Sequence, residues 1–148
     1  MRLVVQRVNK ASVKRINDGE VVGKIDKGFF VLVGIKKGDT PKEVEILSEK
    51  LTKLRVMSDS EDKMNLSVKD TGDKILVVSQ FTLHADVSGG NRPSFINAED
   101  PQKAKELYEL FISKLREKGL EVETGSFGDY MQIDTSLDGP VTILYLDE

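Results

Sequence analysis

Apolar residues alternate with polar ones or form short runs along much of the chain, and this pattern predicts several β-strands. Residues 2–8 alternate loosely and are rich in valine, as strands often are. Residues 21–25 and 29–35 have a similar character and are separated by the turn Asp26-Lys27-Gly28. We therefore expect these three segments to form an antiparallel meander.

Two stretches carry the apolar spacing of amphipathic helices, each with a proline at its first helical position. The first begins with a capping box from Thr40 to Glu43 and is expected to run to about Val56. The second runs from Asp100 to Gly119. Each places four apolar residues on one face. These are Val44, Leu47, Leu51 and Leu54 in the first helix, and Ala104, Leu107, Phe111 and Leu115 in the second.

The remaining apolar segments predict further strands. A buried strand is expected within residues 74–81, after a charged turn at 58–63, and the last strands are expected near Val122, at 131–133 and at 141–146. Strands and helices that are segregated in this way indicate an α+β fold, with a curved, mainly antiparallel sheet or barrel and two main helices. We expect one domain that covers the whole chain, residues 1–148.

The composition narrows the possible chemistry. Of 148 residues, 39% are hydrophobic and 32% are charged, as in globular proteins, and none is cysteine. The lack of cysteine excludes disulfides, thiolate nucleophiles and cysteine-ligated zinc. The first residues do not form a signal peptide, and no apolar run reaches the roughly 20 residues that span a bilayer. The expected compartment is the cytoplasm, with no membrane association.

Positive charge is concentrated near the start of a chain whose net charge is −3. Between residues 2 and 15 there is no acid, but there are five cations: Arg2, Arg7, Lys10, Lys14 and Arg15. This segment is either a solvated strand face or a local phosphate-contacting patch. Proteins that sheathe long nucleic acids are usually basic, but a protein that touches only the end of an RNA needs few such contacts.

The usual equipment of hydrolases is missing. His84 is the single histidine, and the sequence has no Walker loop, no dinucleotide-binding glycine motif and no nucleophile elbow. A metal site normally needs two or more His or Cys ligands. Either the protein is not an enzyme, or its catalysis depends on backbone groups and on the substrate.

Residues 79–83 are the first segment with candidate chemistry, because polar side chains directly follow a buried strand. One interpretation is a strand edge whose polar groups are satisfied by neighbouring loops. The other is the rim of a site, where backbone N–H groups past Gln80 form an oxyanion hole and Thr82 offers a hydroxyl.

Two further segments have similar alternatives. In residues 138–142 a Gly-Pro pair marks either an ordinary strand entry or a cis peptide that holds two backbone carbonyls in a fixed direction. Residues 88–95 form either a mobile loop or a nucleotide contact in which Phe95 is available for stacking.

Taken together, these segments resemble the D-aminoacyl-tRNA deacylase family, also called D-tyrosyl-tRNA deacylase. The similarity covers nearly the whole chain and rests on five segments in order and at the family's spacing: Gln6-Arg7-Val8 with Ala11-Ser12-Val13, Lys63 to Val68, Ser79 to Leu83, Arg92-Pro93-Ser94-Phe95 and Gly139-Pro140-Val141-Thr142. The chain departs from the family at His84, where members commonly carry tyrosine, and at Leu137, where asparagine is usual.

The resemblance implies hydrolysis of the ester that joins a D-amino acid to the terminal adenosine of tRNA, with rejection of L-amino acid esters. The protein would then act in chiral proofreading during translation, with glycyl-tRNA mischarged on tRNA-Ala as a further substrate. No metal or organic cofactor is implied. A homodimer is implied, in which the cis peptide Gly139-Pro140 enters the partner subunit's pocket.

The resemblance also implies the site residues. The reaction would take place at Ser79, Gln80, Phe81 and Thr82, and the substrate would be bound by Gly139, Pro140, Arg7, Phe95 and Met131. Because the ester is already activated, positioning and an oxyanion hole carry most of the catalysis, with assistance from the ribose 2′-hydroxyl.

A competing mechanism uses Thr82 as a covalent nucleophile and His84 as its base, since residues i and i+2 of a strand share a face. It would make the protein a general esterase. A third possibility is a protein that binds RNA ends without catalysis.

Overall fold

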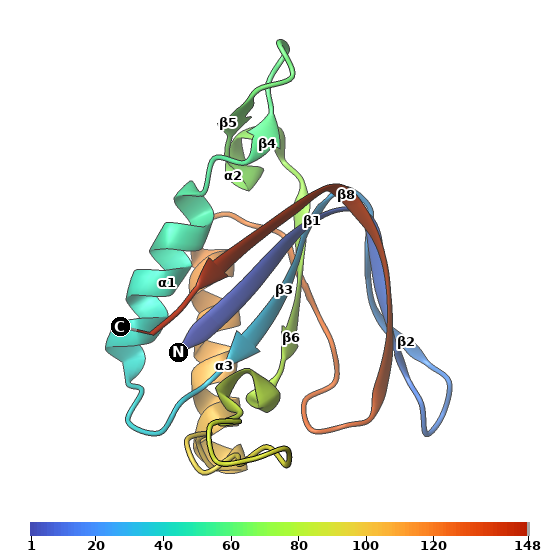
Figure 1. Cartoon of the computed structure of the whole chain (residues 1–148). Helices are drawn as coiled ribbons and strands as arrows, with labels where there is room; N and C mark the ends of the chain where they lie inside the picture. The colour runs from blue at the N-terminus through green and yellow to red at the C-terminus, as the bar shows by residue number, and fades with distance from the viewer. Residues whose placement is uncertain (148) are drawn as a thin grey trace.

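The computed structural model describes residues 1–147 and consists of a strongly bent β-sheet with helices packed on one outer face (Figure 1). It confirms the α+β class and the two main helices. The elements in chain order are β1 (Arg2–Arg15), β2 (Val21–Ile25), β3 (Gly28–Gly34), α1 (Pro41–Lys53), β4 (Met57–Ser58), β5 (Met64–Leu66), α2 (Val68–Thr71), β6 (Lys74–Ser79), the 3₁₀ turn η1 (Phe81–His84), α3 (Pro101–Glu117), β7 (Val122–Thr124) and β8 (Met131–Tyr145).

Strand β1 organises the sheet. On one side β8 pairs with it antiparallel over residues 3–15. On the other side β3 pairs with residues 2–8 and β2 with residues 11–14, both antiparallel. The expected meander is therefore wrong, because β1 lies between its neighbours instead of beginning a series. With 14 residues, β1 is long enough to pair with β3 and β2 one after the other.

β1 and β8 bend together at the top of Figure 1 and continue down the other side of the molecule. Register shifts interrupt their pairing between Gln6 and Lys10 of β1, and residues 138–141 of β8 have no register partner there. The apolar segments 131–133 and 141–146, expected as separate strands, are therefore the two arms of the single strand β8.

The second half of the sheet is parallel. β6 pairs with β3, and β7 pairs with β6, both in parallel. Parallel neighbours need long crossovers, and α1 and α3 lie in these two connections. β7 in turn approaches β2 so closely that a Cβ on Gly23 would lie 2.3 Å from the carbonyl oxygen of Thr124. The order β1-β2-β7-β6-β3 thus comes close to closing as a barrel.

Two apolar clusters stabilise these layers. The larger lies between the sheet and the helices α1 and α3, and it includes the fully buried Phe29 and Phe111. The smaller lies between the two arms of the bent sheet and includes Val13 from β1 and Leu76 from β6. Burying a side chain of this kind contributes about 1.5–3 kcal/mol each.

The two predicted helices begin as expected. Thr40 caps α1 and forms a capping box with Glu43, and Asp100 caps α3. α1 ends at Lys53 and not near Val56, because the chain is extended from Leu54 onward and leads into the small hairpin β4–β5. The charged turn predicted at 58–63 joins the two strands of this hairpin. Within residues 1–147, no helix is long and apolar enough to cross a bilayer.

The close approach of β2 and β7 predicts that a methyl group added at Gly23 lowers the stability of the fold. Gly23→Ala places Cβ against the Thr124 carbonyl and the Leu76 side chain, so it should destabilise the fold by about 1–3 kcal/mol. Thermal unfolding should show this as a Tm lowered by roughly 2–4 °C per kcal/mol. Gly89→Ala is the control, because no atom lies within 4 Å of its added Cβ. Equal Tm values for the two variants would contradict the packing described.

Candidate active site

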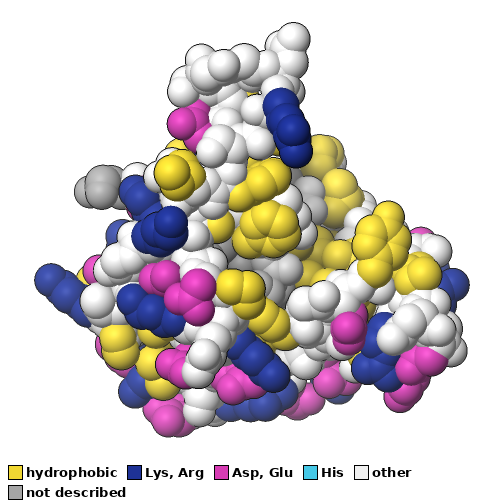
Figure 2. Space-filling view, turned by 90° about the horizontal axis from the view of Figure 1, so that it is seen from below, with side chains coloured by type: hydrophobic (Ala, Val, Ile, Leu, Met, Phe, Trp, Pro, Cys, Tyr) yellow, Lys and Arg dark blue, Asp and Glu magenta, His cyan; other side chains and the backbone are white. Residues whose placement is uncertain are grey.

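A cavity of about 660 Å³ opens where β3 and β6 end, at the lower end of the molecule in Figure 1. Its walls come from four parts of the chain: Ile35 after β3, the end of β6 with η1, the loop before α3 with the first turn of α3, and the β7–β8 connection with the first residues of β8. Figure 2 views this end and shows hydrophobic side chains gathered on it. Five of the nine residues expected in the site line this cavity, namely Ser79, Gln80, Phe81, Phe95 and Met131.

The residues after Ser79, which were expected to continue the strand, form a turn instead. The backbone N–H of Gln80 donates to the carbonyl of Val33 at 2.8 Å, and the chain then enters η1. No side chain caps this turn. The first N–H groups of a helical turn have no acceptor within it, so the backbone at Phe81 and Thr82 retains hydrogen-bonding capacity beside the cavity.

Thr82 and His84 do not form a nucleophile–base pair. Because they lie on a 3₁₀ turn and not on a strand, spacing i to i+2 does not place them on one face. Thr82 is exposed and its hydroxyl accepts from the side-chain amide of Gln80. His84 is 3% exposed, and its Nε2 lies 3.0 Å from the carbonyl oxygen of Gly34. Burial lowers the pKa of His84, which keeps the ring neutral.

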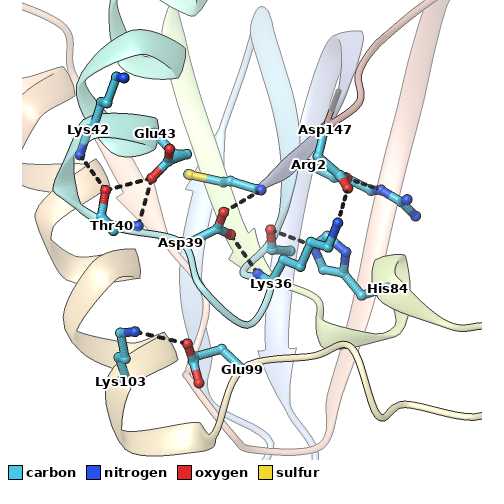
Figure 3. Close-up of polar contacts among 12 residues, drawn as sticks. Arg2, Lys36, Asp39, Thr40, Lys42, Glu43, His84, Glu99, Lys103 and Asp147 are labelled. Atoms are coloured by element: carbon cyan, nitrogen blue, oxygen red, sulfur yellow. Dashed lines mark hydrogen bonds and ion pairs between the residues drawn. The ribbon is translucent and has the colours of Figure 1, made fainter.

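Side chains that gather at one end of the sheet hold η1 in place (Figure 3). Arg2 donates from Nη1 to the carbonyl of Leu83 at 2.8 Å. Its guanidinium also pairs with Asp147, which lies 2.8 Å from Nζ of Lys36. Burial opposes ionisation of Asp147, but hydrogen bonds from Lys36 and Arg2 outweigh it and hold the pKa of this carboxyl well below its usual range. The ion pairs of Asp147 therefore fix Arg2, and Arg2 fixes the position of η1.

An exposed aromatic pair borders the cavity. The rings of Phe81 and Phe95 meet edge to face, with centroids 5.0 Å apart and an interplanar angle of 70°. Phe81 is 55% exposed and Phe95 is 38% exposed. The loop that carries Phe95 is closed by backbone hydrogen bonds between Asp86 and Ser94, both 2.8 Å long. Exposed aromatic rings of this kind suit stacking against an unpaired nucleobase.

Gly139 and Pro140 lie at the bend of β8, away from the cavity of their own chain, and the peptide between them is cis. Gly139 has φ +125°, and a Cβ there would lie 2.9 Å from the backbone nitrogen of Val141. Arg7 fixes the bend: its Nε lies 3.1 Å from the carboxylate of Asp138, and its Nη1 donates to the carbonyl of Val56 at 2.8 Å. Arg7 thus contacts the Gly-Pro segment and not the cavity.

The strand register shows how far apart the two segments are. Arg7 lies opposite Phe29 in β3, which lies opposite Ile75 in β6. From Ile75 to Ser79 the chain advances about 13 Å along the strand, and two strand spacings of about 4.8 Å separate β1 from β6. Within one chain, Gly139-Pro140 and the Ser79 segment therefore do not meet.

Of the five cations between residues 2 and 15, three already form ion pairs. Arg2 pairs with Asp147, Arg7 pairs with Asp138, and Arg15 pairs with Asp18 and Glu20. Lys10 and Lys14 form no ion pair with any residue in 1–147. They alternate with the buried Ala11 and Val13, so they project from the outer face of β1, where the register also places Lys24 of β2.

Two carboxylates line the cavity, Glu99 and Asp129. The backbone N–H of Asp100 lowers the pKa of Glu99, and Lys103 pairs with it at 3.1 Å. Asp129 accepts a hydrogen bond from the hydroxyl of Ser126. In the described part of the chain, no group of three or more His, Asp or Glu side chains is arranged to hold a metal ion.

Two residues that help to build the site were not expected there from the sequence. Tyr130 lines the cavity mouth, and Arg2 supports η1 from behind. The first precedes a strand and the second begins one, so hydrophobic periodicity carries no information about either role.

Comparison with known proteins gives consistent matches over nearly the full length. The family model for D-Tyr-tRNA(Tyr) deacylase matches residues 4–146. D-aminoacyl-tRNA deacylases from Clostridium perfringens (strain SM101 / Type A) and Brevibacillus brevis are 53% and 55% identical over 144 residues. These alignments cover 97% of this chain, with 95% of the first relative and 98% of the second.

Solved structures agree with the fold. A structure described as c-Myc DNA Unwinding Element Binding Protein has a TM-score of 0.92 and 41% identity, with 100% of this chain and 99% of that chain covered. A probable eukaryotic D-amino acid tRNA deacylase has a TM-score of 0.82 with 97% of both chains covered, and at 17% identity it supports the fold alone.

The buried ring of His84 predicts a pH dependence of stability. Its pKa is lowered in the folded protein, so the unfolded chain takes up the proton first as the pH falls below 6.5. This contribution to the free energy of unfolding is complete above pH 6.5 and is lost below it. His84→Gln keeps a donor for the Gly34 carbonyl and should flatten the decline of Tm between pH 6.5 and 5.

The same variant separates a structural histidine from a catalytic one. Because His84 contacts Gly34 and not Thr82, its replacement should leave the rate of hydrolysis at pH 7.5 within about twofold of wild type. Loss of a catalytic base, by contrast, commonly lowers the rate by roughly 10²–10⁴-fold. Loss of that size in a folded His84→Gln protein would restore the Thr82–His84 mechanism.

Proposed function

The chain belongs to the D-Tyr-tRNA(Tyr) deacylase family, and from this premise we infer that it hydrolyses the ester bond of D-aminoacyl-tRNA. It is an enzyme that releases the free D-amino acid and the tRNA, and its action is chiral proofreading in translation. The observation that supports this most directly is a largely apolar cavity that combines an exposed aromatic pair with an uncapped backbone turn. The aromatic pair suits the terminal adenosine, and the turn suits the ester.

The reaction needs little from side chains. Water adds to the ester carbonyl carbon, the carbonyl oxygen gains negative charge, and the bond to the ribose oxygen then breaks as that oxygen takes a proton. Backbone N–H groups at the start of η1, at Phe81 and Thr82, are our candidates for the donors that stabilise the oxyanion. Ser79 and Gln80 hold that backbone at the end of β6, and the 2′-hydroxyl of the terminal ribose assists proton transfer.

A second copy of the chain completes the site. Gly139-Pro140 does not reach the cavity of its own chain, so we propose that it enters the cavity of a partner in a homodimer. The face of β1 and β8 that turns away from the helices supports this, because Leu144 on it is 56% exposed and pairs in register with Val4. Leu137, beside the Gly-Pro segment, is 45% exposed. Exposed apolar surface of this kind is a common feature of subunit contacts.

Chiral selection follows from the rigidity of this segment. Backbone carbonyls at Gly139 and Pro140 accept hydrogen bonds from the substrate amino group, which fixes the directions of the other substituents on the α-carbon. An L side chain then meets protein, whereas a D side chain points outward, and many D side chains are tolerated because none needs its own pocket. Glycine has no side chain to reject, so glycyl-tRNA is also a substrate. Arg7, which pairs with Asp138, positions this segment.

The RNA needs only a few further contacts. Lys10, Lys14 and Lys24 on the outer face are the candidates for phosphate contacts, because Arg2, Arg7 and Arg15 already pair with acidic side chains. Met131 and Phe95 complete the cavity wall around the terminal nucleoside. No organic cofactor is proposed, and we place the enzyme in the cytoplasm, where aminoacyl-tRNA is used.

The activity is tested with D-Tyr-tRNA and L-Tyr-tRNA, following ester loss over time. The D ester should be hydrolysed at least about a hundredfold faster than the L ester, which corresponds to roughly 2.7 kcal/mol in the transition state. Glycyl-tRNA should be hydrolysed as well. Equal rates for the two enantiomers, or no loss above that in buffer, would rule out a chiral deacylase.

The composite site is tested by mixing two defective chains. Ser79→Arg fills the cavity, and Gly139→Val displaces the Gly-Pro segment because its Cβ meets Val141. Each variant alone should be inactive. In a randomly exchanged mixture, half of the dimers are mixed and each contains one intact site, so about a quarter of wild-type activity should return. No recovery from two folded variants would place the whole site within one chain.

A further inference from the structure

We propose that Tyr130 is a stacking platform for the nucleobase that precedes the terminal adenosine of the RNA. This rests on the proposed function and extends it by one nucleotide, because the cavity is proposed to take the aminoacylated adenosine and the exposed Tyr130 lies at its mouth. The proposal assigns a second RNA contact to the protein, outside the chemistry of the ester.

The exposure of Tyr130 is the first observation. Its side chain lines the mouth of the cavity and is 83% exposed, more than any other large hydrophobic side chain among residues 1–147. Phe81 and Phe95, by contrast, contact one another on a different wall of the cavity. The ring of Tyr130 has no such aromatic neighbour among the described residues, so its face remains available.

The backbone under this ring is well fixed. The carbonyl of Tyr130 accepts from the N–H of Ile16 at 3.0 Å, and Met131, the next residue, is paired with Arg15 in the sheet. Earlier in the same connection, the ring of Phe127 packs against Tyr108 with centroids 5.6 Å apart. An exposed ring on a fixed backbone loses little conformational entropy on binding, which favours its use as a contact surface.

The size of the cavity and a neighbouring cation indicate RNA as the occupant. A volume of about 660 Å³ is that of a pocket for one small ligand, so the next nucleotide must lie outside it. Gln132, two residues after Tyr130, lies opposite Lys14, so a cation with no ion pair among residues 1–147 stands on the neighbouring strand. An aromatic face beside a positive charge is the usual arrangement for binding single-stranded nucleic acid, where the base stacks and the cation meets a phosphate.

The test measures binding and not hydrolysis, so that it is independent of the deacylase reaction. The probe is an uncharged RNA hairpin with the sequence of a tRNA acceptor stem and its single-stranded 3′ end. Tyr130→Ala should raise its Kd about five- to tenfold, in the range expected for loss of one stacked base. Tyr130→Leu should behave like Tyr130→Ala, and Tyr130→Phe should stay within about twofold of wild type, because the ring is what binds. Val87→Ala is the control, since Val87 is 67% exposed but does not line the cavity.

A second RNA identifies the nucleotide. It carries an abasic site at the position before the terminal adenosine and is otherwise identical. Wild-type protein should bind it five- to tenfold more weakly, about the loss seen with Tyr130→Ala, and Tyr130→Ala should lose no further affinity for it. Equal loss by Tyr130→Ala on both RNAs, or no loss on either, would overturn the proposal. If the protein binds as expected but hydrolyses no ester, the proposed function fails while this contact stands.

Discussion

Everything in this molecule depends on one strand being hydrogen-bonded on both sides along nearly its whole length. β1 pairs with β8 on one side and with β3 and then β2 on the other. A strand in that position cannot bend alone, so the sheet bends as a unit. The bend creates the two arms, the apolar cluster between them and the open end that becomes the cavity. The same bend carries Gly139-Pro140 to the opposite end of the sheet from η1.

In the proposed mechanism backbone groups carry the chemistry of the cavity, and side chains act mainly by holding that backbone. η1 has no side-chain cap, and Arg2 and His84 fix it through the carbonyls of Leu83 and Gly34. At the other end Arg7 does the same for the Gly-Pro bend. A substitution does not replace backbone N–H and C=O groups, so a mutation can affect them only by displacing the main chain. An enzyme so constructed needs few reactive side chains, which fits a sequence with one histidine and no cysteine.

Local rules predicted the elements better than their arrangement. The capping box at Thr40 and the apolar stripe through Phe111 depend on neighbouring residues only, and both were confirmed. The meander failed because pairing partners are chosen by strand length and long-range packing, which periodicity does not report. The motif 79–83 led to the cavity, but its turn did not follow from a polar-apolar pattern. Tyr130 gave no signal, since exposure at a cavity mouth is a property of the assembled fold.

The long outer strand has a consequence for how copies of the chain can associate. Among residues 1–147, β8 pairs only with β1, so its other edge offers free backbone groups, the usual route to unlimited strand-by-strand growth. Pro140 provides no N–H, and the bend at Gly139 turns the two arms in different directions, so no incoming straight strand can follow the edge from end to end. Growth into fibres is thereby obstructed at the middle of the strand. Association through the face of the sheet, as in the proposed homodimer, does not use this edge.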